Sequence, residues 1–186
     1  MTDAPPDSGS TGAQSARHEP FVADAELRRL FDYWRSTRNG RSMPAKADID
    51  PVDIGWALSR IFLADYSAEE GFTYRLAGAE IAKVLGKTNL KGSNLRDVVN
   101  PERLEQVEQS WLRAVEERAV IRMAGMVYYG ADRTAMGERL LLPLAEQANG
   151  PVTGLLGMTV CRWTDGPSAT EIEAPTVEAL PVGDIP

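Results

Sequence analysis

The chain contains a single histidine and a single cysteine, and this scarcity excludes many kinds of catalytic and metal site. The histidine, His18, lies in an N-terminal stretch rich in Ser, Thr, Ala and Gly. A Ser-His-Asp or Cys-His nucleophile needs an imidazole beside it, and a typical zinc site needs several His or Cys ligands. We therefore predict that the protein is not an enzyme.

The cysteine, Cys161, has no partner for an internal disulfide, which favours a reducing compartment and a cytoplasmic location. Asp48, Asp50 and Asp53 are spaced like the start of a calcium loop. Such a loop also needs a glycine at its sixth position and a glutamate at its twelfth, which here are Asp53 and Ser59. No metal site is predicted.

Long apolar runs are also missing, since none approaches the roughly 20 residues that span a bilayer. Residues 1–20 lack the basic and apolar regions of a signal peptide. The net charge of -7 comes from the two ends, because residues 164–186 carry five acids and no base. The neutral middle has no block of Arg or Lys to neutralise phosphates. We expect neither a membrane nor a nucleic acid as partner.

The length of 186 residues suits one domain with extensions, and 43% apolar residues can form one core. Both ends are rich in proline and small or polar residues, which cannot bury enough apolar surface to offset chain entropy. We predict a disordered tail over 1–20, a domain over 21–163, and an acidic Pro/Ala-rich disordered tail over 164–186.

An amphipathic helix is predicted over 24–37, with Asp24 as its N-cap. Its apolar stripe has the i, i+3, i+4, i+7 spacing and consists of Leu27, Leu30, Phe31 and Trp34. Such a stripe on an external helix needs something to cover it. We expect it to contact a second copy of the chain or a signalling protein.

The rest of the domain is predicted to alternate strands and helices. A hairpin is expected over 61–77, a short helix over 79–85, and a long amphipathic helix from Pro101 that includes Trp111. Three strands follow over 120–129, 135–144 and 152–163, and the Asn149-Gly150 pair is a strong hairpin signal before the last. This order predicts an α+β fold.

Several short motifs then carry a family resemblance. They are Trp34, Met43-Pro44, Ala47-Asp48-Ile49-Asp50-Pro51 with Ile54, Phe62-Leu63 with Asp65, Tyr74-Arg75-Leu76-Ala77-Gly78, Leu85-Gly86 with Leu90 and Gly92, and Leu140-Leu141-Leu142-Pro143-Leu144. With them the chain resembles the PAS superfamily over residues 27–162, and within it the stand-alone PAS-like family common in alphaproteobacteria. The resemblance implies a PAS fold, with a five-stranded antiparallel sheet, helices on one face and an N-terminal amphipathic helix. It also implies a sensory or protein-interaction module in signal transduction.

The resemblance does not extend to the cofactors of well-known PAS sensors. Light-sensing relatives carry a flavin-binding cysteine in a Gly-Arg-Asn-Cys-Arg sequence, where this chain has Leu95 within Gly92-Ser93-Asn94-Leu95-Arg96. The lone histidine in the N-terminal tail argues against histidine-ligated haem, although ligation by Met, Tyr or Cys stays open. No cofactor is predicted, and an unidentified small ligand stays open.

Such a ligand would occupy a cavity between the sheet and the helices. The residues predicted to line it are Tyr74, Leu85, Trp111, Met123, Met158 and Cys161. The alternative is an ordinary filled core, because apolar stripes serve both purposes. The sequence thus predicts a non-catalytic regulatory module. The alternatives are a small-molecule enzyme with a cone-like pocket, using Asp65, Tyr74 and Arg75, and a purely structural interaction module with a filled core.

Overall fold

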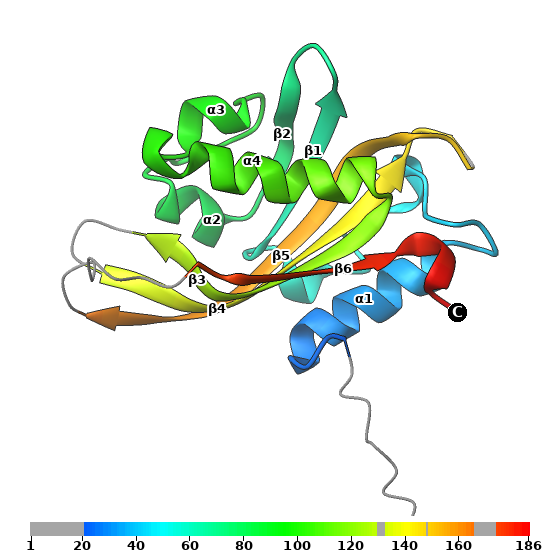
Figure 1. The fold of residues 1–186 in the computed structure, drawn as a ribbon, viewed down its shortest axis with the longest axis horizontal. Coiled ribbons are helices and arrows are strands. Elements are labelled where there is room, and N and C mark those ends of the chain that lie inside the picture. The colour runs from blue at the N-terminus through cyan, green and yellow to red at the C-terminus, as the bar shows by residue number, and fades with distance from the viewer. Residues whose placement is uncertain (1–20, 130–132, 148, 166–173) are drawn as a thin grey trace, which may run out of the picture.

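A computed structural model describes residues 21–129, 133–147, 149–165 and 174–186. One antiparallel sheet has six strands in the order β2-β1-β5-β4-β3-β6, with helices on both of its faces (Figure 1). The strands are β1 (Ile61–Ser67), β2 (Gly71–Ala77), β3 (Ala119–Tyr129), β4 (Arg133–Ala145), β5 (Val152–Asp165) and β6 (Thr176–Pro181). The α-helices are α1 (Ala25–Thr37), α2 (Ala79–Val84), α3 (Leu95–Val98) and α4 (Pro101–Glu116). Short 3-10 helices are η1 (Lys46–Asp48), η2 (Gly55–Ala57) and η3 (Val182–Asp184).

The α+β fold class is confirmed, and the first five strands fall where the sequence places them. The sixth strand was not predicted. β6 pairs with β3 from Ala119↔Pro181 to Ala124↔Thr176, at the edge of the sheet. The expected disordered tail over 164–186 is therefore wrong for β6 and η3, and β5 itself runs to Asp165. The expected tail over 1–20 lies outside the described residues.

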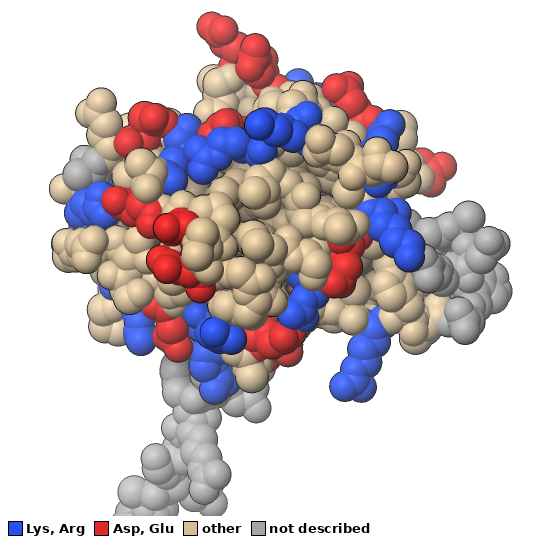
Figure 2. All heavy atoms as spheres, turned by 180° about the vertical axis from the view of Figure 1, so that it is seen from behind, with Lys and Arg blue, Asp and Glu red and all other residues tan. Residues whose placement is uncertain are grey.

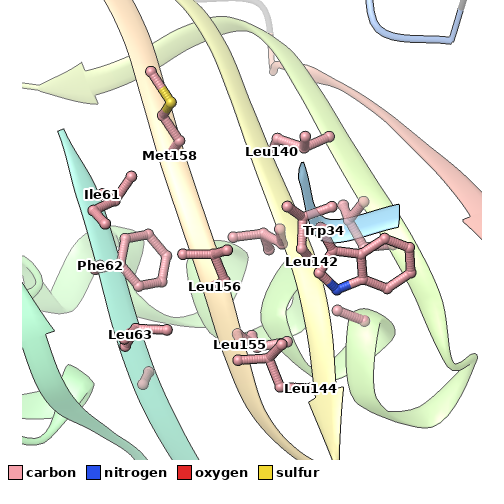
Figure 3. Close-up of a cluster of buried hydrophobic side chains, with 14 of the residues drawn as sticks. Trp34, Ile61, Phe62, Leu63, Leu140, Leu142, Leu144, Leu155, Leu156 and Met158 are labelled. Carbon is pink, nitrogen blue, oxygen red and sulfur yellow. The ribbon is translucent and has the colours of Figure 1, made fainter. Parts of the chain in front are cut away.

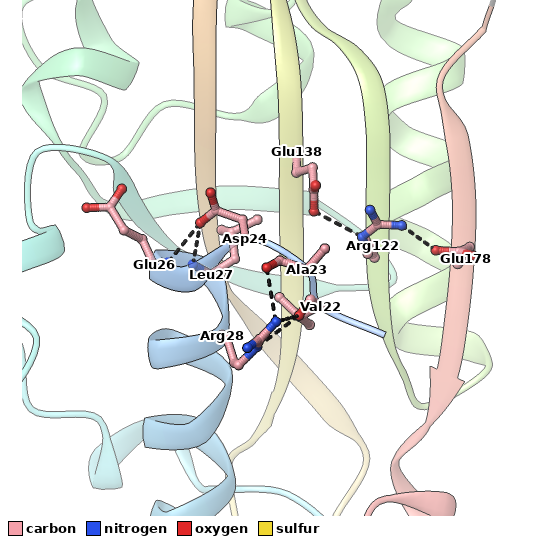
Figure 4. A network of polar contacts seen from close by, with 9 residues as sticks. All are labelled: Val22, Ala23, Asp24, Glu26, Leu27, Arg28, Arg122, Glu138 and Glu178. Atoms are coloured by element: carbon pink, nitrogen blue, oxygen red, sulfur yellow. Dashed lines mark hydrogen bonds and ion pairs between the residues drawn. The ribbon is translucent and has the colours of Figure 1, made fainter. Parts of the chain in front are cut away.

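β6 is ordered because side chains as well as the backbone hold it. Val182 and Ile185, which follow the strand, are buried in the core. Arg122 on β3 donates to Glu138 on β4 at 3.0 Å and to Glu178 on β6 at 2.6 Å (Figure 4). Arg38 adds hydrogen bonds to the backbone carbonyls of Ile185 and Pro186. None of these contacts is local in the sequence.

The predicted helix over 24–37 is confirmed as α1. Asp24 Oδ1 accepts hydrogen bonds from the backbone N–H groups of Glu26 at 2.8 Å and Leu27 at 3.0 Å, as an N-cap should (Figure 4). The helix packs on β4 and β5, where Trp34 Nε1 donates to the Pro143 carbonyl at 2.9 Å. Figure 3 shows the Trp34 ring beside leucines of β4.

The expected partner surface on α1 is wrong for three of its four residues. Leu27, Leu30 and Trp34 are each 0% exposed, so the chain's own sheet covers them. Phe31 is half-buried and stacks on Trp34 with ring centroids 6.1 Å apart. The expectation failed because β4 and β5 present apolar side chains on both faces, and α1 covers the second face.

The opposite face of the sheet carries α2, α3 and α4 (Figure 1). α4 begins at Pro101, and the Asn100 side chain accepts from the Glu102 N–H at 2.9 Å. Trp111 and Ala114 on this helix are buried against the sheet. The layers are therefore α1, the sheet, and the group of α2, α3 and α4.

Candidate ligand cavity

A cavity of about 90 Å³ lies between the sheet and the helices α2, α3 and α4. Its lining is mostly apolar or aromatic and consists of Phe62, Tyr74, Ile81, Val84, Leu85, Leu95, Val99, Asn100, Arg103, Val107, Trp111, Val127, Tyr128 and Arg139. No Asp, Glu, His or Cys is among these lining residues. The space can accommodate a small molecule, and the charged residues among those that the structure describes in its lining, Arg103 and Arg139, are basic.

The aromatic wall of the cavity depends on a glycine in β5. Phe62 on β1 pairs with Gly157, and a Cβ atom at position 157 would overlap the Phe62 ring. Because this atom is missing, the ring lies flat on the sheet and stacks on Trp111, with centroids 4.7 Å apart and planes 4° from parallel. Tyr74 meets both rings edge to face, at 5.7 Å and 5.8 Å. Such aromatic pairs prefer these two geometries.

A bulge in β3 forms the other wall. The register with β4 shifts between Met126 and Tyr128, which leaves Val127 as an extra residue. Successive side chains of a regular strand point to opposite faces, yet Val127 and Tyr128 both line the cavity. The bulge also frees the Val127 carbonyl from the strand ladder, and it accepts a hydrogen bond from Arg139 Nη2 at 3.1 Å.

Arg139 is the most unusual residue of the cavity, since its side chain is charged and the residue is only 7% exposed. Its Nε donates to Oγ1 of Thr159, its cross-strand neighbour, at 2.9 Å. Its guanidinium carbon lies 4.8 Å from the centre of the Tyr128 ring, a cation–π distance. Among the described residues, no carboxylate forms an ion pair with Arg139.

Two further groups can donate hydrogen bonds at the cavity. Burial raises the pKa of the Tyr74 hydroxyl, nearby Arg139 lowers it less, and the phenol therefore stays protonated near neutral pH. The indole N–H of Trp111 is buried and has no hydrogen-bond partner in the described part of the chain. Asn100 and Arg103 complete the polar part of the lining.

Three of the six residues predicted for a ligand site come together in this cavity, namely Tyr74, Leu85 and Trp111. Met158 lies on the opposite face of β5, because its neighbour Gly157 is the residue that faces Phe62 (Figure 3). Met123 is buried between β4 and β6 and is not part of the lining. Ligand contact by any of the six stays a prediction.

Cys161 is not among the lining residues of the cavity. It lies with Arg60 and Glu80 in two other pockets, one of which adjoins the cavity and shares Ile81, Val84 and Tyr128 with it. Burial raises the pKa of its thiol, which disfavours the reactive thiolate. Asp65 and Arg75, weighed as catalytic groups, do not line the cavity either. Asp65 forms an ion pair with Lys46 at 3.0 Å, and Arg75 is exposed.

Leu95, at the position of the flavin-binding cysteine in light-sensing relatives, is buried and lines the cavity. The loop before it closes the edge of the sheet. The Gly92 N–H donates to the Tyr74 carbonyl at 2.7 Å, and the Tyr74 N–H donates to the Ser93 carbonyl at 3.0 Å. This loop thereby fixes the backbone of Tyr74.

Sequence reasoning missed Arg139, the residue that distinguishes the cavity from an ordinary core. The signal was a charged residue directly before the apolar run Leu140-Leu141-Leu142 of β4. A charge at an inward position of a strand is rarely fully buried unless it has a partner or a function.

Comparison with known proteins agrees with this architecture. A family model described as a PAS domain matches residues 22–160, and the chain belongs to that family. No curated protein and no solved structure matches the chain. None of the helices in the described ranges is long and apolar enough to cross a membrane. The family match ends before β6, so this strand is an addition to the matched region.

Proposed function

We propose that the chain is a non-catalytic sensory module in which a small ligand binds the cavity and changes a surface that a protein partner reads. Membership of the PAS domain family supports a sensory or regulatory module at a coarse level. The observation that carries the finer proposal is the cavity itself, where apolar walls surround the buried guanidinium of Arg139. Ligand sites in proteins commonly combine apolar walls with a few convergent polar groups.

The strands that form the floor of the cavity also support α1 and contact β6, which offers a route for the signal. Arg139 faces the cavity, so its neighbours in the strand, Glu138 and Leu140, face the other side of the sheet. This is the side that carries α1, where Glu138 accepts from Arg122 (Figure 4). A movement of β4 at Arg139 would therefore be transmitted to the contacts of Glu138. A ligand can drive such a change only by binding one state more tightly than the other.

The cavity favours binding over catalysis. Its lining holds no Asp, Glu, His or Cys, which are the groups that most often act as acids, bases or nucleophiles. No observation favours the enzyme alternative. A completely filled core would not leave the space of about 90 Å³. The proposal places the module in the cytoplasm, in keeping with a sequence that has one cysteine.

The partner is proposed to be a signalling protein or a second copy of the chain. It would use a surface other than the stripe of Leu27, Leu30 and Trp34, because the sheet already covers that stripe. On the face opposite to that of Figure 1, charged side chains of both signs surround a largely uncharged central area (Figure 2). Mixed charge of this kind suits a protein partner better than a nucleic acid.

Native mass spectrometry of the full chain, purified from the cells in which it occurs, tests the proposal. We expect a retained small molecule in the unmutated chain. Val107→Phe places a larger side chain in the cavity wall, and the molecule should then be lost. Val115→Phe is the matched control, because Val115 is equally half-buried on α4 but does not line the cavity. The proposal would be contradicted if the unmutated chain retains no small molecule, or if the two variants retain the molecule equally.

A further inference from the structure

The charged side chains that line the cavity all carry a positive charge. Among the described residues they are those of Arg103 and Arg139. An arginine side chain remains protonated at any physiological pH. A buried charge is strongly disfavoured unless it is paired and hydrogen-bonded. Here the partners of Arg139 in the described chain are the Thr159 hydroxyl, the Val127 carbonyl and the Tyr128 ring, and all three are neutral.

These neutral partners use only some of the hydrogen-bond donors of the Arg139 guanidinium. It carries five N–H donors in a planar fork, and the described residues accept hydrogen bonds from Nε and Nη2. Two other lining side chains carry hydrogen-bond donors. They are the protonated Tyr74 hydroxyl and the buried indole N–H of Trp111, which has no partner among the described residues. The cavity thus offers donors and lacks an anionic acceptor.

We propose that the ligand is a small monocarboxylic acid with an apolar body, whose carboxylate pairs with Arg139. This inference rests on the function proposed above. A planar carboxylate matches the guanidinium fork through two parallel hydrogen bonds. A phosphate or sulfate fits less well, because the remaining walls near Phe62, Ile81 and Trp111 are apolar. Those walls would instead contact the hydrocarbon part of the acid.

The size of the cavity narrows the class further. A space of about 90 Å³ is well below the volume of a typical drug-sized pocket. An apolar cavity of about 150 Å³ is known to bind a benzene molecule, and the space here is smaller than that. The acid should therefore have no ring and only a short chain, as in propanoate or butanoate.

Binding of propanoate and butanoate to the full chain can be compared with binding of the neutral analogues propanamide and butanamide. Isothermal titration calorimetry at pH 7 keeps both acids ionised, since carboxyl pKa values lie near 4. We expect each acid to bind roughly ten- to a hundredfold more tightly than its amide, as a charge-assisted hydrogen bond implies.

Three variants test whether Arg139 causes the preference for the acid over the amide. Arg139→Met should abolish it, and Arg139→Lys should keep part of it, because lysine retains the charge but not the planar fork. Arg122→Met is the matched control, since Arg122 lies in the neighbouring strand but forms its ion pairs on the other face of the sheet. It should leave the preference unchanged. If Arg139→Met does not fold, the lysine variant and the comparison of acids with amides show whether Arg139 recognises the carboxylate.

Three results would overturn the inference. If the amides bind as tightly as the acids, the ligand is not recognised as an acid. If both Arg139 variants keep the full preference, Arg139 is not the group that recognises the carboxylate. The proposed sensory function would stand in both cases, because a small molecule still binds the chain. If none of the four compounds binds, the acid class is also wrong. In that case native mass spectrometry tests the proposed function separately. A retained small molecule would support it, and the absence of one would contradict it.

Discussion

The ring of Phe62 occupies the space above Gly157 that the side chain of any other residue would fill. This one relationship places three aromatic rings at the cavity, since Phe62 in turn stacks on Trp111 and meets Tyr74 edge to face. The aromatic wall therefore depends on the absence of a single methyl group in β5.

Gly157→Ala should displace the Phe62 ring and destabilise the fold by about 1–3 kcal/mol, as overpacking does in other cores. Chemical denaturation measures the loss, and near-ultraviolet circular dichroism reports the changed aromatic packing. Gly183→Ala is the control, because a Cβ atom there meets nothing within 4 Å. Equal stability of the two variants would show that the Phe62 ring can move aside without loss.

Leu30→Ala tests whether α1 is part of the core or a contact surface for a partner. Leu30 is 0% exposed, so we expect a loss of about 2–5 kcal/mol and no change in oligomeric state. Denaturation and sedimentation measure the two quantities. Arg35→Ala, on the exposed side of α1, should change stability by less than about 0.5 kcal/mol. A dissociated oligomer with unchanged monomer stability would restore the original expectation for α1.

Removal of residues 174–186 should destabilise the domain, because it uncovers the edge of β3 and removes the buried Val182 and Ile185. An open edge also promotes association between chains. Denaturation and light scattering check both effects. Glu178→Gln is a mild comparison that weakens only one exposed ion pair to Arg122. If the shortened chain is as stable and as soluble as the full chain, β6 makes no contribution to the domain.

The Tyr74 hydroxyl should make stability depend on pH above about 10, the ordinary pKa of tyrosine. Burial raises its pKa in the folded state, so the folded chain keeps the phenol protonated where the unfolded chain ionises. This contribution is complete below the unfolded pKa and is lost as pH rises toward the folded pKa.

We therefore expect the free energy of unfolding to fall more steeply above pH 10 in the unmutated chain than in Tyr74→Phe. Denaturation series at several alkaline pH values measure the difference. Absorbance of the phenolate should show one fewer late-titrating tyrosine in the variant. Parallel pH profiles in the two proteins would mean that Tyr74 is not held protonated by burial.

Local signals in the sequence predicted the elements that depend on local contacts. Asp24 and the apolar spacing after it predicted α1, and Asn149, with a φ of 59°, adopts the left-handed conformation that a hairpin turn needs. β6 was missed because the strand depends on contacts with distant residues such as Arg122, which outweigh the composition of the segment.

The cavity was predicted only in part, for a different reason. β5 is apolar on both faces, so alternation could not show whether Gly157 or Met158 points toward the helices. A shift of one residue changes the face of every side chain in a strand. The position of Arg139 depends in addition on the bulge at Val127, which sequence spacing does not reveal.

An NMR titration of the tryptophan indole N–H signals tests the central claim most directly. Trp111 lines the cavity, its indole N–H has no hydrogen-bond partner in the described chain, and Trp111→Phe identifies its signal. The Trp34 indole N–H, bonded to Pro143 on the other face of the sheet, is an internal reference. We predict a saturable shift of the Trp111 signal with butanoate that exceeds the shift of the Trp34 signal and is absent in Arg139→Met. A Trp111 signal that moves no more than the Trp34 signal at saturating acid would contradict the account.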